Sequence, residues 1–186
     1  MLYLLLAEGF EEIEAVAPLD ILRRAEIPVK TVGVTGDVVT GAHGIAIKAD
    51  VSLNDMEIAS ADGVILPGGM PGTLNLQKAP QVIDALNHCA KKKKLIASIC
   101  AAPMVPGAMG LLEGRRAVCF PGFEDQLEGA VLQEDSVVQD ENYITAKGAG
   151  VAIQFGAAIV DYCCGVQERG SKGKRLLQQM QFSCDE

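Results

Sequence analysis

The stretch Lys94-Leu95-Ile96-Ala97-Ser98-Ile99-Cys100-Ala101-Ala102-Pro103-Met104 decides the fold that this chain can adopt. Its first half is a short apolar run, which is typical of a strand buried inside a parallel sheet. Pro103 then suits the first turn of a helix, where its missing N–H would have no partner in any case. The sequence therefore predicts a strand that turns directly into a helix, with Cys100 at the turn.

A cysteine at the apex of a strand–turn–helix unit has the geometry of a nucleophile elbow. The sulfur would lie over the N-terminus of the following helix, where free N–H groups and the helix dipole favour a thiolate. The alternative is that Cys100 is only a small buried apolar residue. The local pattern leaves both interpretations open, because Ile99 and Ala102 stand where an elbow usually has glycines.

Outward from this stretch, strands and helices alternate along the chain. Besides 95–99, we expect strands over residues 1–6, 29–34, 63–66 and 117–120. We expect helices over residues 11–25, 73–77, 80–91, 103–109, 151–162 and 171–181. Two hairpins are expected, joining 38–40 to 45–47 and 137–139 to 143–146. This alternation predicts an α/β fold, a three-layer sandwich with a mainly parallel sheet and a small β-hairpin.

The expected helix 11–25 carries two further predictions. Its periodicity places Ile13, Val16 and Ile21 on one apolar face, together with Ala17. Pro18 lies inside the helix and predicts a kink or a local break, since proline removes one backbone hydrogen bond.

Composition favours a single domain spanning residues 1–186, because a chain of 186 residues that is 49% hydrophobic can bury a sizeable core. We expect no membrane contact, since no apolar run reaches the length of a membrane span. The acidic residues directly after the first apolar run argue against a signal peptide, so we expect a cytoplasmic protein. The net charge of −8 and an aromatic content of 4% disfavour nucleic-acid binding.

The six cysteines show no CxxC spacing, and disulfides are not expected in such a chain. Only His43 and His88 offer imidazole ligands, so we expect no metal site and no cofactor. His43 is interpreted as an exposed loop residue. Cys119 is expected to be a buried thiol, with a resolving role for Cys100 as the minor alternative. We expect Cys163 and Cys164, at the end of a helix, to pack against the sheet.

In an open α/β sheet, ligands bind beyond the carboxyl ends of the strands. Three expected strands end at chemically distinctive loops: the turn at Glu8, the glycine pair Gly68-Gly69, and Cys100. These loops are far apart in the sequence, and this architecture would bring them to one edge of the sheet.

The chain resembles the ThiJ/PfpI superfamily in three blocks: Leu6-Ala7-Glu8-Gly9-Phe10-Glu11-Glu12-Ile13-Glu14, Leu66-Pro67-Gly68-Gly69 and Ser98-Ile99-Cys100-Ala101-Ala102-Pro103. The resemblance is to the Parkinsonism-associated deglycase branch, and within it to the bacterial ThiJ-type members. It covers residues 1 to about 165. It implies a flavodoxin-like sandwich that forms a homodimer.

The resemblance also implies roles for individual residues. Cys100 would be the nucleophile, and Glu14 the carboxyl that touches it. Backbone N–H groups of Gly69 and Ala101 would form an oxyanion site, with Gly68 in the same binding loop. An ionised Glu14 would raise the pKa of the thiol, because like charges repel. We therefore expect a coupled pair in which the pKa of the carboxyl is raised and the pKa of the thiol is lowered.

The chain departs from the family pattern at three positions. Ala101 stands where peptidases and hydrolases of the superfamily have a histidine, so peptidase activity is not expected. Phe120 stands where the human-type branch has a histidine, which removes a candidate proton shuttle. Ala102 replaces a glycine of the human-type elbow. At the last two positions the ThiJ-type members resemble this chain.

Three functions are compatible with these residues. The first is a cofactor-independent glyoxalase or deglycase, in which Cys100 attacks glyoxal, methylglyoxal or their early adducts. The second is an oxidative-stress sensor or redox-regulated chaperone, in which Cys100 is oxidised and Glu14 is hydrogen-bonded to the product. The third is the family's older label of thiamine thiazole biosynthesis, which no phosphate-binding motif in this chain supports.

Overall fold

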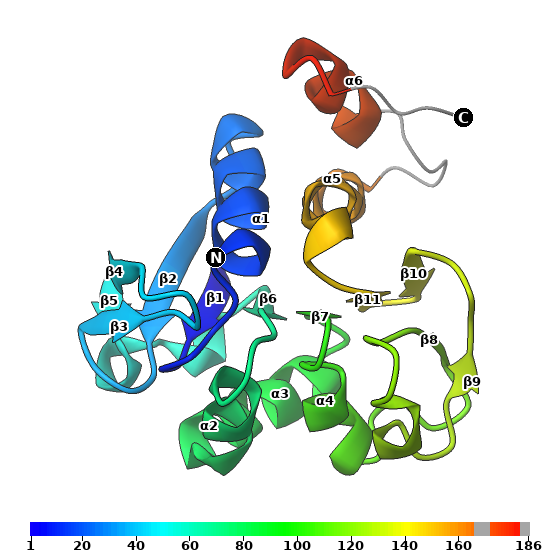
Figure 1. The fold of residues 1–186 in the computed structure, drawn as a ribbon, viewed down its shortest axis with the longest axis horizontal. Helices are drawn as coiled ribbons and strands as arrows, with labels where there is room; N and C mark the ends of the chain where they lie inside the picture. Colours follow the sequence, from blue (N-terminus) through cyan, green and yellow to red (C-terminus); the bar gives the residue numbers. More distant parts are fainter. Residues whose placement is uncertain (166–171, 183–186) are drawn as a thin grey trace.

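A seven-stranded sheet lies at the centre of the computed structural model, which describes residues 1–165 and 172–182 (Figure 1). The strand order is β10-β11-β7-β6-β1-β2-β5. These strands are β1 (Leu2–Leu6), β2 (Val29–Gly33), β5 (Val51–Ser52), β6 (Gly63–Leu66), β7 (Leu95–Ile99), β10 (Val137–Asp140) and β11 (Tyr143–Ala146). Every neighbouring pair is parallel except β10 with β11.

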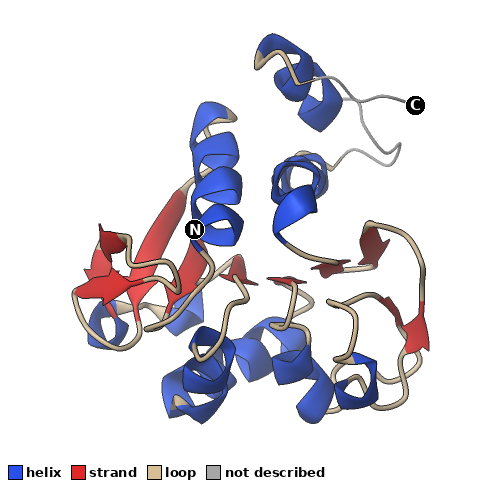
Figure 2. Ribbon diagram, viewed as in Figure 1, coloured by secondary structure: helices blue, strands red, loops and turns tan. Residues whose placement is uncertain are grey.

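Helices cover both faces of the sheet (Figure 2). One face carries α1 (Glu12–Arg24), α5 (Ala152–Cys163) and α6 (Lys172–Gln179); the other carries α2 (Gly72–Lys78), α3 (Pro80–Lys91) and α4 (Met104–Ala108). Short 3₁₀ turns lie at Leu53–Asp55, Ile58–Ser60, Glu124–Gln126 and Ala149–Val151. Two hydrophobic clusters fill the space between the sheet and its two helical layers. The predicted three-layer α/β sandwich is confirmed.

Strand β7 lies between β6 and β11 in the middle of the sheet, and all five of its residues are buried. Leu95, Ala97 and Ile99 belong to one hydrophobic cluster, whereas Ile96 belongs to the other. A strand packed on both faces needs a nearly continuous apolar run, which explains the sequence from which the prediction started.

Both predicted hairpins are present. Strand β3 (Val38–Thr40) pairs with β4 (Ala46–Lys48), and β10 pairs with β11; both pairs are antiparallel. The β3–β4 hairpin lies outside the main sheet, beside β5 in Figure 1.

Helix α1 continues through Pro18, so the expected break at this residue is wrong. The explanation lies in the packing of α1 against α5. A Cβ atom at Gly156 of α5 would come within 3.0 Å of the Pro18 Cα atom and the Ile21 Cδ1 atom. The two helices thus approach closely at this point, and the packing holds α1 together where proline removes a hydrogen bond.

The predicted apolar face of α1 is wrong at its N-terminal end. Ile21 is buried, but Ile13 is 55% exposed and Val16 is 45% exposed. Glu12 and Glu14 are buried in their place, at 5% and 0% exposure. Because these carboxylates accept hydrogen bonds from loop N–H groups, the first turns of the helix are oriented by polar contacts rather than by apolar periodicity.

The expected strand over residues 117–120 is only two residues long. Strand β8 (Arg116–Ala117) pairs in parallel with β9 (Val131–Leu132) in a separate small sheet. The chain then leaves this pairing, since the Val118 N–H donates to the Thr145 hydroxyl at 3.0 Å.

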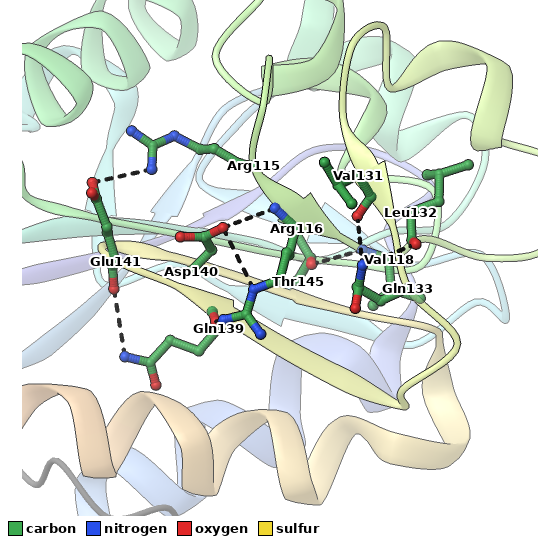
Figure 3. Close-up of polar contacts among 10 residues, drawn as sticks. All are labelled: Arg115, Arg116, Val118, Val131, Leu132, Gln133, Gln139, Asp140, Glu141 and Thr145. Carbon is green, nitrogen blue, oxygen red and sulfur yellow. Dashed lines mark hydrogen bonds and ion pairs between the residues drawn. The ribbon is translucent and has the colours of Figure 1, made fainter.

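A polar network joins this small sheet to the β10–β11 hairpin (Figure 3). The Arg116 N–H donates to the Asp140 carboxylate at 2.8 Å, and the Arg116 guanidinium donates to the Gln139 carbonyl at 3.0 Å. Arg115 pairs with Glu141 at 3.1 Å and lies 4.3 Å from the centre of the Tyr143 ring. The segment that follows β8 is therefore anchored to the hairpin.

The cysteines near the C-terminal end differ from expectation. Cys163 and Cys164 are exposed at the end of α5, so the prediction that they pack against the sheet is wrong. Residue 184, and residue 171 at the predicted start of the last helix, lie outside the described ranges. Within those ranges, no helix is both long and apolar enough to cross a lipid bilayer.

The crossing of α1 and α5 predicts a stability effect. Gly156→Val should lower the free energy of unfolding by about 1–3 kcal/mol, because the new side chain has to push two packed helices apart. Gly150→Val is the matched control, since nothing lies within 4 Å of a Cβ atom at this exposed position. Urea unfolding measures both. An equal loss of unfolding free energy in the two variants would contradict the close packing of α1 against α5 at Gly156.

Candidate active site

Cys100 lies at a sharp turn directly after β7, as the elbow interpretation predicts. Its φ angle is 64°, in the left-handed region that residues other than glycine seldom adopt. The Cys100 N–H donates to the Ala146 carbonyl at 2.9 Å, and the Cys100 carbonyl accepts from the Phe120 N–H at 2.8 Å. The turn is thus fixed from two sides. Helix α4 begins only at Met104 and has five residues, so the expected support from the helix dipole is small.

The Glu14 carboxyl reaches Cys100 from the first helix. Glu14 is fully buried, and its Oε2 atom accepts the Gly68 N–H at 2.8 Å. Gly68 lies between the two functional side chains. A Cβ atom at this position would come within 2.7 Å of both the Cys100 Cβ and the Glu14 Oε2. Only glycine therefore permits this arrangement.

The predicted binding loop also lies at this place. The backbone N–H groups of Ala101 and Gly69 lie close enough to the Cys100 thiol to lower its pKa, against the larger effect of burial. Gly69 has a φ of 88°, and a Cβ atom there would come within 2.4 Å of the Glu11 nitrogen. All five residues expected at the site are thus brought together. The strand order explains this, because β1, β6 and β7 are neighbours and their carboxyl ends meet at one edge.

Of the two predicted pKa shifts, the rise at Glu14 is present and the fall at Cys100 is not. Burial raises the pKa of Glu14 to about 7, although hydrogen bonds from Gly68 and Cys100 oppose the rise. The expected lowering at the sulfur is wrong. Burial and the neighbouring Glu14 carboxylate raise the pKa of the Cys100 thiol to about 12, and the two backbone N–H groups only partly compensate.

These pKa values determine where the protons lie. Near neutral pH the Glu14 carboxyl gains and loses a proton readily, whereas the Cys100 thiol keeps its own. A carboxylate in contact with a thiol can accept the thiol proton when the sulfur attacks an electrophile. Once Glu14 is protonated, its charge no longer opposes the thiolate, so the two groups titrate as a pair.

Gly148 and Phe120 lie on the side of the site that contains the other Glu14 oxygen, Oε1. Oε1 is buried and has no hydrogen-bond partner among the described residues. A Cβ atom at Gly148 would lie 3.9 Å from this oxygen and 3.2 Å from the Phe120 ring. Gly148 and the half-exposed Phe120 therefore border the carboxyl. Gly148 was not among the site residues that the sequence predicted.

Cys119 lines a cavity of about 180 Å³ together with Lys147 and Glu124. Its side chain is buried, as expected, and burial with the nearby Glu124 charge raises the pKa of its thiol to about 11. Cys100 is not among the residues that line this cavity. The geometry thus gives no support to a resolving role for Cys119.

Comparison with known proteins identifies relatives that match most of the chain. Residues 1–162 match the DJ-1/PfpI family. A Parkinson disease protein 7 homolog of Danio rerio is 36% identical over 88% of this chain and 89% of its own length. A protein of Caenorhabditis elegans named glutathione-independent glyoxalase DJR-1.2 is 34% identical over 94% of each chain.

A solved structure shows the same fold. The structure of oxidized Toxoplasma gondii DJ-1 superposes with a TM-score of 0.90 at 30% identity, covering 98% of each chain.

The raised pKa of Glu14 predicts a dependence of stability on pH. The folded protein binds this proton more tightly than the unfolded chain, whose pKa is about 4.5. The stabilisation is complete below pH 4.5 and is lost as the pH rises to about 7. Relative to Glu14→Gln, the wild type should therefore lose up to about 3 kcal/mol of unfolding free energy over this interval. Urea unfolding at several pH values measures it, with the exposed Glu113→Gln as control. Parallel profiles for wild type and Glu14→Gln would contradict the raised pKa.

Proposed function

Because the chain belongs to the DJ-1/PfpI family, we propose that it is a cysteine-dependent enzyme acting on small reactive aldehydes. Its substrates are glyoxal, methylglyoxal or the early adducts that they form on thiols and amines. The observation that carries the proposal is the buried Glu14 carboxyl beside Cys100, with only the Cβ-free Gly68 between the two side chains. The name of the glyoxalase from Caenorhabditis elegans, 34% identical, supports it.

The first step forms a covalent adduct. The Cys100 sulfur attacks the aldehyde carbon while its S–H proton passes to the Glu14 carboxylate. The carbonyl oxygen then takes up a proton from Glu14, which gives a hemithioacetal. The N–H groups of Gly69 and Ala101 stabilise the negative charge that develops as the thiol proton leaves.

The second step is an internal redox reaction. For methylglyoxal, Glu14 carries the hydrogen of the former aldehyde carbon, as a proton, to the neighbouring carbonyl carbon, and the hydroxyl proton of the hemithioacetal passes to the neighbouring carbonyl oxygen. One carbon is oxidised and the other is reduced, so the adduct becomes a thioester of lactate. Water cleaves this thioester, which releases lactate and restores the thiol. The net reaction consumes one water molecule and requires no external redox cofactor.

The borders of the site favour a small substrate. Phe120 and Gly148 flank the free Glu14 oxygen, and Gly68 leaves no space between Glu14 and Cys100. Ala101 provides no imidazole next to the nucleophile, so the pairing on which cysteine peptidases depend is missing. In this proposal, Glu14 is the acid–base group.

A second candidate is an oxidative-stress sensor or redox-regulated chaperone that uses the same sulfur. The Toxoplasma gondii relative was solved in an oxidized form, which favours this alternative. Peroxide would convert the Cys100 thiol to a sulfenic acid with loss of water, and a second peroxide would give the sulfinic acid. A protonated Glu14 would donate a hydrogen bond to the product.

We also propose that the chain forms a homodimer through α1. Ile13 and Val16 leave apolar side chains exposed near the start of this helix. Exposed apolar groups that are contiguous on a helix are typical of protein–protein contacts.

The dimer proposal predicts a change in mass. Ile13→Asp combined with Val16→Asp should convert a dimer into a monomer, because each charge would have to be buried in the contact. Light scattering after size exclusion measures the mass. Leu132→Asp is the control, since this exposed leucine lies on β9 rather than on α1. The proposal would be contradicted by a monomeric wild type. It would also be contradicted if Leu132→Asp reduced the mass as much as the double variant does.

The catalytic proposal predicts loss of turnover in two variants. Cys100→Ala should abolish formation of lactate from methylglyoxal, and Glu14→Gln should lower kcat by about 10²–10⁴-fold. Cys119→Ala is the matched control and should retain activity, because this thiol lines a cavity to which neither Cys100 nor Glu14 contributes. Equal lactate formation by wild type and Cys100→Ala would contradict the enzyme. Conversion of Cys100 to a stable sulfinate by mild peroxide, without turnover, would favour the sensor.

A further inference from the structure

A second cluster of ligand-type side chains lies at the N-terminal end of α1, where the loop between β3 and β4 contacts the helix. The His43 Nδ1 atom lies 3.0 Å from the Glu12 Oε2 and 3.4 Å from the Glu11 Oε2. The ligand atoms of the three residues all lie within 4.8 Å of one another. The sequence predicted no metal site, because it offers only two histidines as imidazole ligands. His43 and Glu12 are 31 residues apart, and the fold brings them together.

We propose that Glu11, Glu12 and His43 bind a zinc-type transition-metal ion. Zinc holds imidazole nitrogen and carboxylate oxygen at about 2.0–2.2 Å, which sets ligand atoms about 3.3–3.5 Å apart in a tetrahedron. The two separations from His43 already lie close to this value. Three protein ligands would leave a fourth position for water, and the His43 side chain is 68% exposed, so that position faces solvent.

The Glu12 carboxylate is fixed in the orientation that a ligand requires. Its Oε1 atom accepts the backbone N–H groups of His43 at 2.8 Å and Ile45 at 3.2 Å. This leaves Oε2 directed at the imidazole. Residues that bind metals are commonly oriented by such hydrogen bonds to their other polar atom. Because the residue is only 5% exposed, surrounding atoms also restrict its rotation.

The negative charge of the Glu11 and Glu12 carboxylates also favours a bound cation. Two carboxylates converge on one imidazole nitrogen, and one of them is buried. In the described part of the chain, neither Glu11 nor Glu12 forms an ion pair with a lysine or an arginine. A protonated His43 supplies one positive charge, whereas a divalent ion would balance both carboxylates.

The donor set distinguishes among cations. One imidazole nitrogen with two carboxylate oxygens suits zinc and its first-row neighbours. Calcium takes six to eight oxygen ligands and does not use imidazole, so this set does not fit calcium. The alternative is a plain ion pair between the histidine and the two carboxylates, and the experiment separates the two.

The test is a titration of the full-length chain carrying Cys100→Ser, so that the elbow thiol cannot take up metal. Calorimetry with zinc measures affinity, and cobalt substitution reports the ligands, because cobalt–thiolate bonds give charge-transfer absorption that nitrogen and oxygen ligands lack. We expect one ion bound without thiolate absorption. His43→Gln in the same background should weaken binding at least about tenfold.

His88→Gln is the matched control, because this half-buried histidine lies on α3 and should leave the affinity unchanged. Binding that is as tight with His43→Gln as without it would overturn the proposal, as would thiolate absorption in the cobalt protein. Absence of zinc binding would equally overturn it and leave the ion pair. The outcome is independent of the proposed catalysis, since every protein in the test lacks the elbow thiol.

Discussion

The burial of the Glu14 carboxyl against the Gly68 N–H and Cys100 is the contact on which the arrangement of the site depends. It joins the first helix, the loop after β6 and the turn after β7. A carboxyl removed from water requires hydrogen-bond partners, so the helix has to present its first turns to the loops. The exposure of Ile13 and Val16 follows from that orientation.

The same burial determines the chemistry of the sulfur. Removal from water raises the pKa of both groups, and the carboxylate adds repulsion to the thiolate. Both effects keep the proton on the Cys100 thiol while Glu14 is ionised. In the proposed mechanism, the sulfur is activated during the reaction, when its proton passes to the Glu14 carboxylate.

Much of the fold follows from local pattern, and some of the site does not. The apolar run of β7 gave the bounds of the strand, because a central parallel strand has few alternatives. Grouping of the three loops at one edge follows from topology, and assignment of Glu14 came from the family resemblance. The pattern failed where polar contacts overrode it: α1 turns its acidic residues inward, and residues 118–120 bond to Thr145 and Cys100 instead of extending a strand. The pKa of Cys100 and the position of His43 depend on distances between remote segments, which periodicity does not encode.

The small sheet of β8 and β9 is anchored to the outer hairpin by Arg115 and Arg116, and the chain between the two holds Phe120 against the Cys100 turn. Cys100 and Glu14 belong to the parallel core, whereas Phe120 belongs to a segment with its own hydrogen bonds. Substitutions in that segment would therefore change which molecules reach the sulfur while leaving the two core side chains in position.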